Sequence, residues 1–161
     1  MTDDTLPERS RVIQEQLRAA GLAGEVRELP DSTRTAAEAA AALGCEAGAI
    51  ASSLVFLADG EPILVMTSGR HRVDTALLTT QLGAESVSMA PAKLVKALTG
   101  QPIGGVAPVG HPAPIPTAVD ESLAEYDVLW AAGGTPHTVF PLSYAELLAL
   151  TSGRPLRVAA D

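Results

Sequence analysis

The chain has 161 residues and a mass of 16.5 kDa, a size that fits one domain around one core. Hydrophobic residues make up 47% of it and charged residues 19%, which excludes intrinsic disorder, and an aromatic content of 3% disfavours a base-stacking platform for single-stranded nucleic acid. The net charge of −8 repels a polyanion on average, but residues 66–100 carry four basic and two acidic side chains, so this segment is the most favourable one for a phosphate backbone. We therefore expect a single domain over residues 1–161.

The N-terminal segment, MTDDTLPERS, is acidic and polar, whereas a signal peptide is basic and then apolar. No window offers the roughly 18 uninterrupted apolar residues of a membrane span. The single cysteine, Cys45, rules out an intramolecular disulfide and favours a reducing compartment. We expect a cytoplasmic protein without a membrane partner.

The first third of the chain carries clear signals for helices. Apolar residues recur at helical spacing from 7 to 20 and predict a first helix. Residues 26–29 predict a short strand, and the Pro-Asp-Ser sequence at 30–32 predicts a turn. Thr35-Ala36-Ala37-Glu38 has the spacing of a capping box, which predicts an alanine-rich helix running to Gly44.

The strongest local signal is a β-hairpin. Residues 50–57 and 62–67 are rich in Val, Ile and Leu, and they are joined around Asp59-Gly60. This dipeptide favours the left-handed conformations of a tight hairpin turn. The two segments are therefore predicted to pair as antiparallel strands.

The later elements are predicted from capping residues and apolar runs. In chain order they are helices at 74–82 and 91–98, strands at 128–132 and 138–142, a helix at 143–150 and a closing strand at 156–159. Gly and Pro crowd residues 100–116, which predicts a long loop. Because hairpins replace regular strand-helix-strand units, the expected fold is α+β: one domain with a central mixed or antiparallel sheet and surrounding helices. Trp130 is expected in its core.

Motifs of several common catalytic classes are absent from the sequence. The glycines of residues 100–110 form neither a Gly-x-Gly-x-x-Gly motif nor a Gly-Lys-Ser/Thr phosphate loop. His71, His111 and His137 lack the i, i+4 spacing of a helical metal site, and Cys45 has no base beside it in the sequence. We therefore expect no metal ion and no organic cofactor.

A series of short motifs follows in a fixed order along the chain. They are Thr35-Ala36-Ala37-Glu38, Ile50 to Phe56, Arg72-Val73-Asp74, Thr99-Gly100, Gly104 to Gly110, Val119-Asp120 and Ala131 to Gly134. In this order and spacing, over residues 35–158, the sequence resembles the YbaK/EbsC-like family. These proteins are aminoacyl-tRNA deacylases related to the inserted editing domain of bacterial prolyl-tRNA synthetase. The family's fold is a single α+β domain with a central mixed sheet.

The resemblance implies trans-editing, which is hydrolysis of the ester that joins a wrong amino acid to the terminal ribose of a tRNA. The implied partner is the acceptor end of an aminoacyl-tRNA, with a tRNA synthetase as a further partner and neither DNA nor a membrane. Such a second sieve is useful because a synthetase pocket rejects a smaller amino acid by only about 1–3 kcal/mol. The implied mechanism is attack by water, aided by backbone donors.

The predicted catalytic residues lie on the strand that starts at Ile50 and in the glycine-rich loop. They are Ser52, Gly104, Gly105, Pro108 and His111. The segment Gly104-x-x-x-Pro108 matches the family's loop of that form, in which glycine lets the backbone approach the ester and exposed N–H groups orient water or stabilise an oxyanion. His111 follows this loop, and histidine is suited to proton transfer near neutral pH.

The predicted substrate-binding residues come from four places in the sequence. They are Thr35, Arg70, Arg72, Asp120, Gly133 and Gly134. The resemblance places residues near Thr35 at the amino-acid pocket, and the same hydroxyl caps a helix. Asp120 is a candidate for the pocket floor and, alternatively, a helix cap.

One position departs from the family pattern. Most relatives have a lysine in the motif Ile-x-Lys-Ser/Thr-Leu-Val-Phe, and the resemblance assigns it a contact with the terminal phosphate or ribose of the tRNA. This chain has Ser52 there. Serine offers one neutral hydroxyl in place of a unit charge with three donors, so it cannot make the same contact. Arg70, His71 and Arg72 are candidates to replace the charge, because they follow the strand that pairs with the one bearing Ser52.

Two other functions remain open from the sequence. The first is a binding module that keeps the pocket but lost its chemistry together with the lysine. The second is a hydrolase of a small aminoacyl ester, for which the acidic surface of the chain is no handicap.

Overall fold

The computed structural model describes residues 6–29 and 35–159, and the turn predicted at residues 30–32 lies outside them. Eight strands in the described residues form one mixed sheet in the order β1-β7-β6-β2-β3-β5-β8, with β4 paired to β2. The strands are β1 (Arg27–Glu28), β2 (Ile50–Ala58), β3 (Glu61–Ser68), β4 (Val87–Met89), β5 (Thr117–Asp120), β6 (Leu129–Ala132), β7 (Thr138–Leu142) and β8 (Arg154–Leu156). The α+β fold with a central mixed sheet is therefore confirmed.

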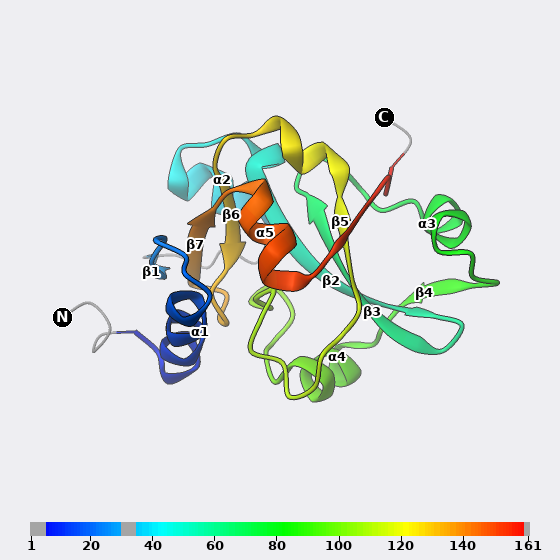
Figure 1. Cartoon of the computed structure of the whole chain (residues 1–161), viewed down its shortest axis with the longest axis horizontal. Coiled ribbons are helices and arrows are strands. Elements are labelled where there is room, and N and C mark those ends of the chain that lie inside the picture. The colour runs from blue at the N-terminus through cyan, green and yellow to red at the C-terminus, as the bar shows by residue number, and fades with distance from the viewer. Residues whose placement is uncertain (1–5, 30–34, 160–161) are drawn as a thin grey trace.

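Five α-helices and two short 3-10 segments surround this sheet in the described chain. They are α1 (Glu8–Ala19), α2 (Ala36–Leu43), η2 (Ala47–Ala49), α3 (Thr75–Leu82), α4 (Ala92–Thr99), η3 (Glu121–Glu125) and α5 (Tyr144–Thr151). Figure 1 shows α1 and β1 at one end of the sheet and α3 and β4 at the other. None of the described helices combines the length and the apolar character that a bilayer crossing requires.

The predicted hairpin forms as expected. Strands β2 and β3 are antiparallel and pair from Ala51 opposite Ser68 to Ala58 opposite Glu61. At the turn, Asp59 has φ of 52° and Gly60 has φ of 85°, so both occupy the left-handed region that a two-residue hairpin turn requires.

Both predicted capping boxes are present. The Thr35 hydroxyl accepts a hydrogen bond from the Glu38 amide at 3.1 Å, and the Thr35 amide donates to the Glu38 carboxylate at 3.2 Å. The same reciprocal pair joins Ser143 and Glu146 at the start of α5. Each box satisfies two backbone donors that a helix start leaves without partners, so the starts of α2 and α5 follow from local sequence.

The sequence analysis did not predict β4 or β5, and it predicted β8 at the wrong residues. Strand β4 has only three residues, too few for a periodic pattern, and β5 follows the proline-rich loop. Strand β8 covers residues 154–156 instead of 156–159, because it is positioned by parallel pairing with β5, from Ala118 opposite Arg154 to Asp120 opposite Leu156. These strands exist through pairing with distant segments, which local sequence does not encode.

The core occupies both faces of the central hairpin. Val55, Leu64 and Met66 pack on one face with side chains from α1 and α5. Phe56 and Val65 pack on the other face with the side chains of α3. Because both faces are covered, β2 and β3 are apolar along most of their length, without the alternation of a half-exposed strand.

A buried carboxylate joins the end of β3 to the end of β5. Asp120 accepts hydrogen bonds from the Ser68 amide at 3.0 Å and from the Ser122 hydroxyl at 2.8 Å, and its carboxylate lies 2.8 Å from His71 Nδ1. Burial by itself raises the pKa of Asp120, but the hydrogen bonds from His71, Ser68 and Ser122 outweigh it, so this pKa lies below its ordinary value. The ionised carboxylate therefore stabilises the fold.

We expect Asp120→Asn to lower the free energy of unfolding at neutral pH by about 1.5–3 kcal/mol, the usual worth of a hydrogen bond to a charged group. A folded-state pKa below the unfolded one gives stability that is present above the unfolded pKa and is lost as the pH falls through the folded pKa. The difference between wild type and variant should therefore shrink below about pH 4. Urea unfolding across pH 3–7 measures it, with the exposed Asp127→Asn as control. A difference that stays constant down to pH 3 would contradict this role.

Candidate functional site

Strand β2 has a different neighbour at each end of one edge. Strand β6 pairs in parallel with Ile50 and Ala51, and β4 pairs antiparallel from Phe56 onward. Between these two ladders, no described strand pairs with residues 52–54 on this side. The sheet therefore has a gap at the middle of β2.

The backbone of Ser53 faces this gap. The Ile50 carbonyl accepts from the Gly69 amide on the β3 side at 2.9 Å, whereas the Val55 carbonyl accepts from the Ala90 amide on the β4 side at 3.0 Å. Successive peptide groups of a strand point to opposite edges, so even-numbered residues bond toward β3 and odd-numbered ones toward the gap. The Ser53 N–H and C=O groups are thus left for a ligand.

A cavity of about 170 Å³ opens at the gap. It is lined by β2, by the start of α2, by Met89 at the end of β4 and the next residue Ala90, by Val95 of α4, by the loop after α4 and by β6 and β7. The lining residues are Thr35, Ala36, Ala39, residues 50–55, Met89, Ala90, Val95, Ile103, Gly104, Val106, Trp130, Ala131, Ala132 and Val139. Their side chains are mostly apolar, and none of those described is titratable. The described lining therefore offers hydroxyls and backbone groups for chemistry.

Buried Gln101 holds the loop that forms one wall. Its side chain accepts from the Ala107 amide at 2.6 Å and donates to the Val109 carbonyl at 3.0 Å. Only 2% of Gln101 is exposed, so these bonds lie in a region screened from water. The loop is therefore a fixed wall.

Two glycines give this wall its shape. Gly104 has φ of 87°, a left-handed conformation that glycine adopts without a steric cost. At Gly105, a Cβ atom would lie 2.5 Å from the carbonyl carbon of Thr135, so the loop packs directly on the backbone of the turn after β6. Any larger residue at 105 must push the wall away from this turn.

Along the loop, backbone amides that donate a hydrogen bond alternate with amides that do not. Gly105 donates to the Pro102 carbonyl, and Ala107 donates to Gln101. The amides of Gly104 and Val106, which both line the cavity, donate to no group of the described residues. The cavity thus has backbone donors on two sides, from this loop and from Ser53.

The cavity brings together three of the predicted site residues, namely Thr35, Ser52 and Gly104. Gly105 supports the same wall from behind. The hydroxyl of Ser52 makes no hydrogen bond to a described residue, whereas that of Ser53 donates to the sulfur of Met66 at 3.1 Å.

Pro108 and His111 line a second hollow on the outer side of the loop, together with Pro114 and residues of α5. Burial lowers the pKa of His111 below its ordinary value, and the bond between His111 Nε2 and the Ala107 carbonyl offsets part of this effect. The structure therefore does not bring these two predicted catalytic residues to the cavity.

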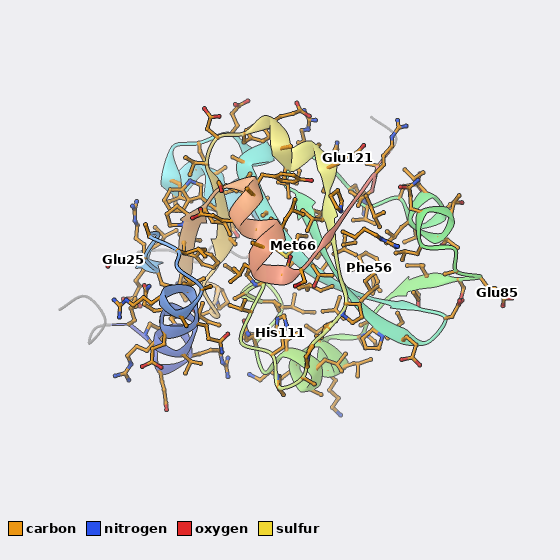
Figure 2. All side chains as sticks on the ribbon, in the orientation of Figure 1. Glu25, Phe56, Met66, Glu85, His111 and Glu121 are labelled. Atoms are coloured by element: carbon orange, nitrogen blue, oxygen red, sulfur yellow. The ribbon has the colours of Figure 1, made fainter. Side chains whose placement is uncertain are left out.

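The remaining predicted binding residues also lie outside the cavity lining. Arg70 pairs with Glu125 at 2.7 Å, and Arg72 is exposed after β3. Asp120 belongs to the buried cluster at the end of β3, where it accepts from the amide of Ser68, and Ser68 pairs with Ala51 of the lining. Figure 2 shows its sequence neighbour Glu121 at the top of the view and His111 near the bottom, so the segments of these two predicted site residues lie apart.

Gly133 and Gly134 form the turn between β6 and β7, directly after Ala132 of the lining. The carbonyl of Gly133 accepts from the Ser10 hydroxyl at 2.7 Å, and a Cβ atom at Gly134 would lie 3.1 Å from Arg9. The turn therefore packs on α1 and supports the cavity from outside its lining.

Sequence reasoning missed several residues of the site. Trp130, expected in the core, is half-buried and lines the cavity, and Arg27 lies over its indole ring. The sequence analysis did not single out Gln101. A lone polar residue beside a glycine-rich loop could have been examined as a side chain that hydrogen-bonds the loop backbone. Within residues 6–29 and 35–159, no three His, Cys, Asp or Glu side chains come together as a set that could hold a metal ion.

The chain belongs to the aminoacyl-tRNA editing domain family, whose model matches residues 30–150. Over 112 residues it is 34% identical to the proline–tRNA ligase of Nitratidesulfovibrio vulgaris strain DP4, a match that covers 69% of this chain and 19% of the ligase. The ligase of Geobacter metallireducens is 35% identical over 77 residues, which cover 48% of this chain and 14% of that protein. The chain thus spans less than a fifth of the length of these ligases.

Solved structures of similar size share the whole fold. One describes a proposed trans-editing enzyme for prolyl tRNA synthetase, with a TM-score of 0.91 and 42% identity, and the match covers 98% of this chain and 100% of the other. The hypothetical protein APE2540 matches with a TM-score of 0.83 and 32% identity, over 91% of this chain and 97% of that one.

We expect Gly105→Ala to lower the free energy of unfolding by about 1–3 kcal/mol, the usual cost of an overpacked contact, and to displace the loop. Because Trp130 is the only tryptophan, a shift of its emission reports a change in the cavity. The control is Gly83→Ala, where φ is 67° and no atom lies within 4 Å of the new Cβ, so only local strain is added. Unchanged emission and stability in Gly105→Ala would refute the close packing of this wall.

Proposed function

We propose that this protein hydrolyses the ester of a mischarged aminoacyl-tRNA, as a trans-editing deacylase. The observation that carries this proposal is the cavity at the gap beside β2, where the free edge of Ser53 faces a glycine loop with two unused amides. An apolar enclosed space fits a small amino-acid side chain, and backbone donors fit the carbonyl oxygen of its ester. The membership of the chain in the editing domain family supports the same substrate class.

The proposed reaction is a simple hydrolysis. A water molecule, held by the hydroxyl of Ser52, attacks the carbonyl carbon of the ester. The carbonyl oxygen becomes negative in the tetrahedral intermediate, and the N–H groups of Gly104 and Val106 stabilise it. When the intermediate collapses, the bond from carbon to the ribose oxygen breaks, and the ribose oxygen takes up the proton that the water loses. The products are a free amino acid and an uncharged tRNA.

Backbone amides suit this role because they are fixed before the substrate arrives. Gln101 and the contact between Gly105 and Thr135 hold the loop, so its donors need little reorganisation as charge develops. Loss of one such donor in other hydrolases costs about 10²–10³ in rate. A neutral serine at position 52 is compatible with this chemistry, since no step requires a charged side chain in the cavity.

The test is deacylation of a panel of tRNAs that carry different amino acids, followed as loss of the aminoacyl group. The matched variants are Ala39→Leu, which adds a side chain inside the cavity, and Ala42→Leu, which adds the same side chain on the exposed face of α2. We expect the first to lower kcat/KM by at least about tenfold, equivalent to 1.4 kcal/mol, and the second to leave it unchanged.

Other outcomes would select the other functions. Tight binding of tRNA without loss of the aminoacyl group would favour a binding module that lacks the chemistry. Hydrolysis of small aminoacyl esters without any action on aminoacyl-tRNA would favour a metabolite hydrolase. Equal rates for Ala39→Leu and wild type would place the reaction outside this cavity.

A further inference from the structure

Arg27 lies over the one aromatic residue of the cavity lining. Its guanidinium carbon is 5.0 Å from the centre of the Trp130 ring, a distance typical of a cation–π contact. Trp130 lines the cavity and stands opposite Ile50, two residues before Ser52 on β2. A positive charge is thus attached to the cavity wall through an aromatic side chain.

The sheet register holds Arg27 on this side. Arg27 of β1 is opposite Val139 of β7, and Val139 is opposite Ala132 of β6. Directly opposite residues share one face of a sheet, and both Val139 and Ala132 line the cavity. Strand β1 therefore carries the arginine on the sheet face that presents Trp130, Ala132 and Val139 to the cavity.

We propose that Arg27 binds a backbone phosphate at the acceptor end of the tRNA and so orients the ester toward the cavity. This inference rests on the proposed function. A guanidinium over an aromatic ring interacts with the ring through its charge, and its N–H donors match the geometry of a phosphate. Arg27 is exposed and forms no ion pair with a described carboxylate, so these donors are available.

Four other cations of the described chain are less suited to this role. Arg70 is engaged with Glu125. Arg154 lies on β8, at the opposite edge of the sheet from β1. Lys93 and Lys96 are exposed on α4, whose buried Val95 is the residue that reaches the cavity. The chain has a net charge of −8, which repels a polyanion on average. A single arginine beside the cavity therefore contributes much of the local attraction for a polyanion.

The first test measures binding of uncharged tRNA through the fluorescence of Trp130, or by filter binding where the variant alters the emission, as a function of salt. We expect Arg27→Ala to weaken binding about tenfold and to reduce the slope of log affinity against log salt by about 0.7, the value for one phosphate contact on a single strand. Arg27→Lys should keep most of the slope, because it keeps the charge. Arg154→Ala, an exposed arginine at the far edge, is the matched control.

The second test compares two substrates with the same ester, an aminoacyl-tRNA and an aminoacyl-adenosine without phosphate. We expect Arg27→Ala to lower the ratio of kcat/KM for the tRNA over that for the adenosine by about tenfold. If wild type hydrolyses neither substrate, the proposed function fails. If wild type hydrolyses both and Arg27→Ala leaves their ratio unchanged, only the role of Arg27 fails.

A third variant places a charge on the neighbouring strand. Ser52→Lys adds an ammonium group at the cavity, and in the Arg27→Ala background we expect it to restore at least part of the lost affinity and salt slope. Restoration shows that the missing element was the charge and not the packing of Trp130. An affinity and salt slope of Arg27→Ala equal to those of wild type, or a loss equal in Arg154→Ala, would overturn the proposal.

Discussion

The site depends on one constraint of the sheet: two strands share the same edge of β2 and do not meet. Strand β6 leaves after Ala51 and β4 arrives at Phe56, so the peptide groups between them have no strand to bond. Unpaired polar backbone is costly in a buried sheet and is normally covered. Here the loop after α4 closes the opening without filling it, which leaves a small cavity with backbone donors and apolar walls.

Some backbone amides of the loop after α4 hold the loop in place, and others are left for a ligand. Gln101 and the Pro102 carbonyl accept from the amides of Ala107 and Gly105, and the amides of Gly104 and Val106 donate to no described residue. A lining whose described residues include no titratable side chain fits a reaction in which the substrate supplies the reactive ester and the protein supplies orientation and stabilises the developing charge. For the proposed tRNA substrate, the positive charge would come from Arg27, which lies over Trp130 of the lining.

The parts of the fold that local sequence encodes were predictable. The Asp59-Gly60 turn and the Thr35 and Ser143 capping boxes are written in a few adjacent residues, and all three form. Thr35, Ser52 and Gly104, which the family resemblance predicts as site residues, line one cavity, and their roles in catalysis and binding stay a prediction. The gap, by contrast, arises from β4 and β6, whose pairing joins residues far apart in the chain. For the same reason Arg27 and Trp130 gave no signal, and the sequence could not show that Pro108 and His111 face a different hollow.

The most direct test of this account is an NMR titration with an aminoacyl-adenosine analogue whose ester is replaced by a stable amide. Backbone ¹⁵N–¹H spectra report each amide separately. The account predicts that the largest shifts fall on Ser53, Gly104 and Val106, with smaller ones at Gly105, whose N–H is already bonded. Shifts concentrated at Val109, Gly110 and His111, with the three cavity amides unmoved, would contradict it.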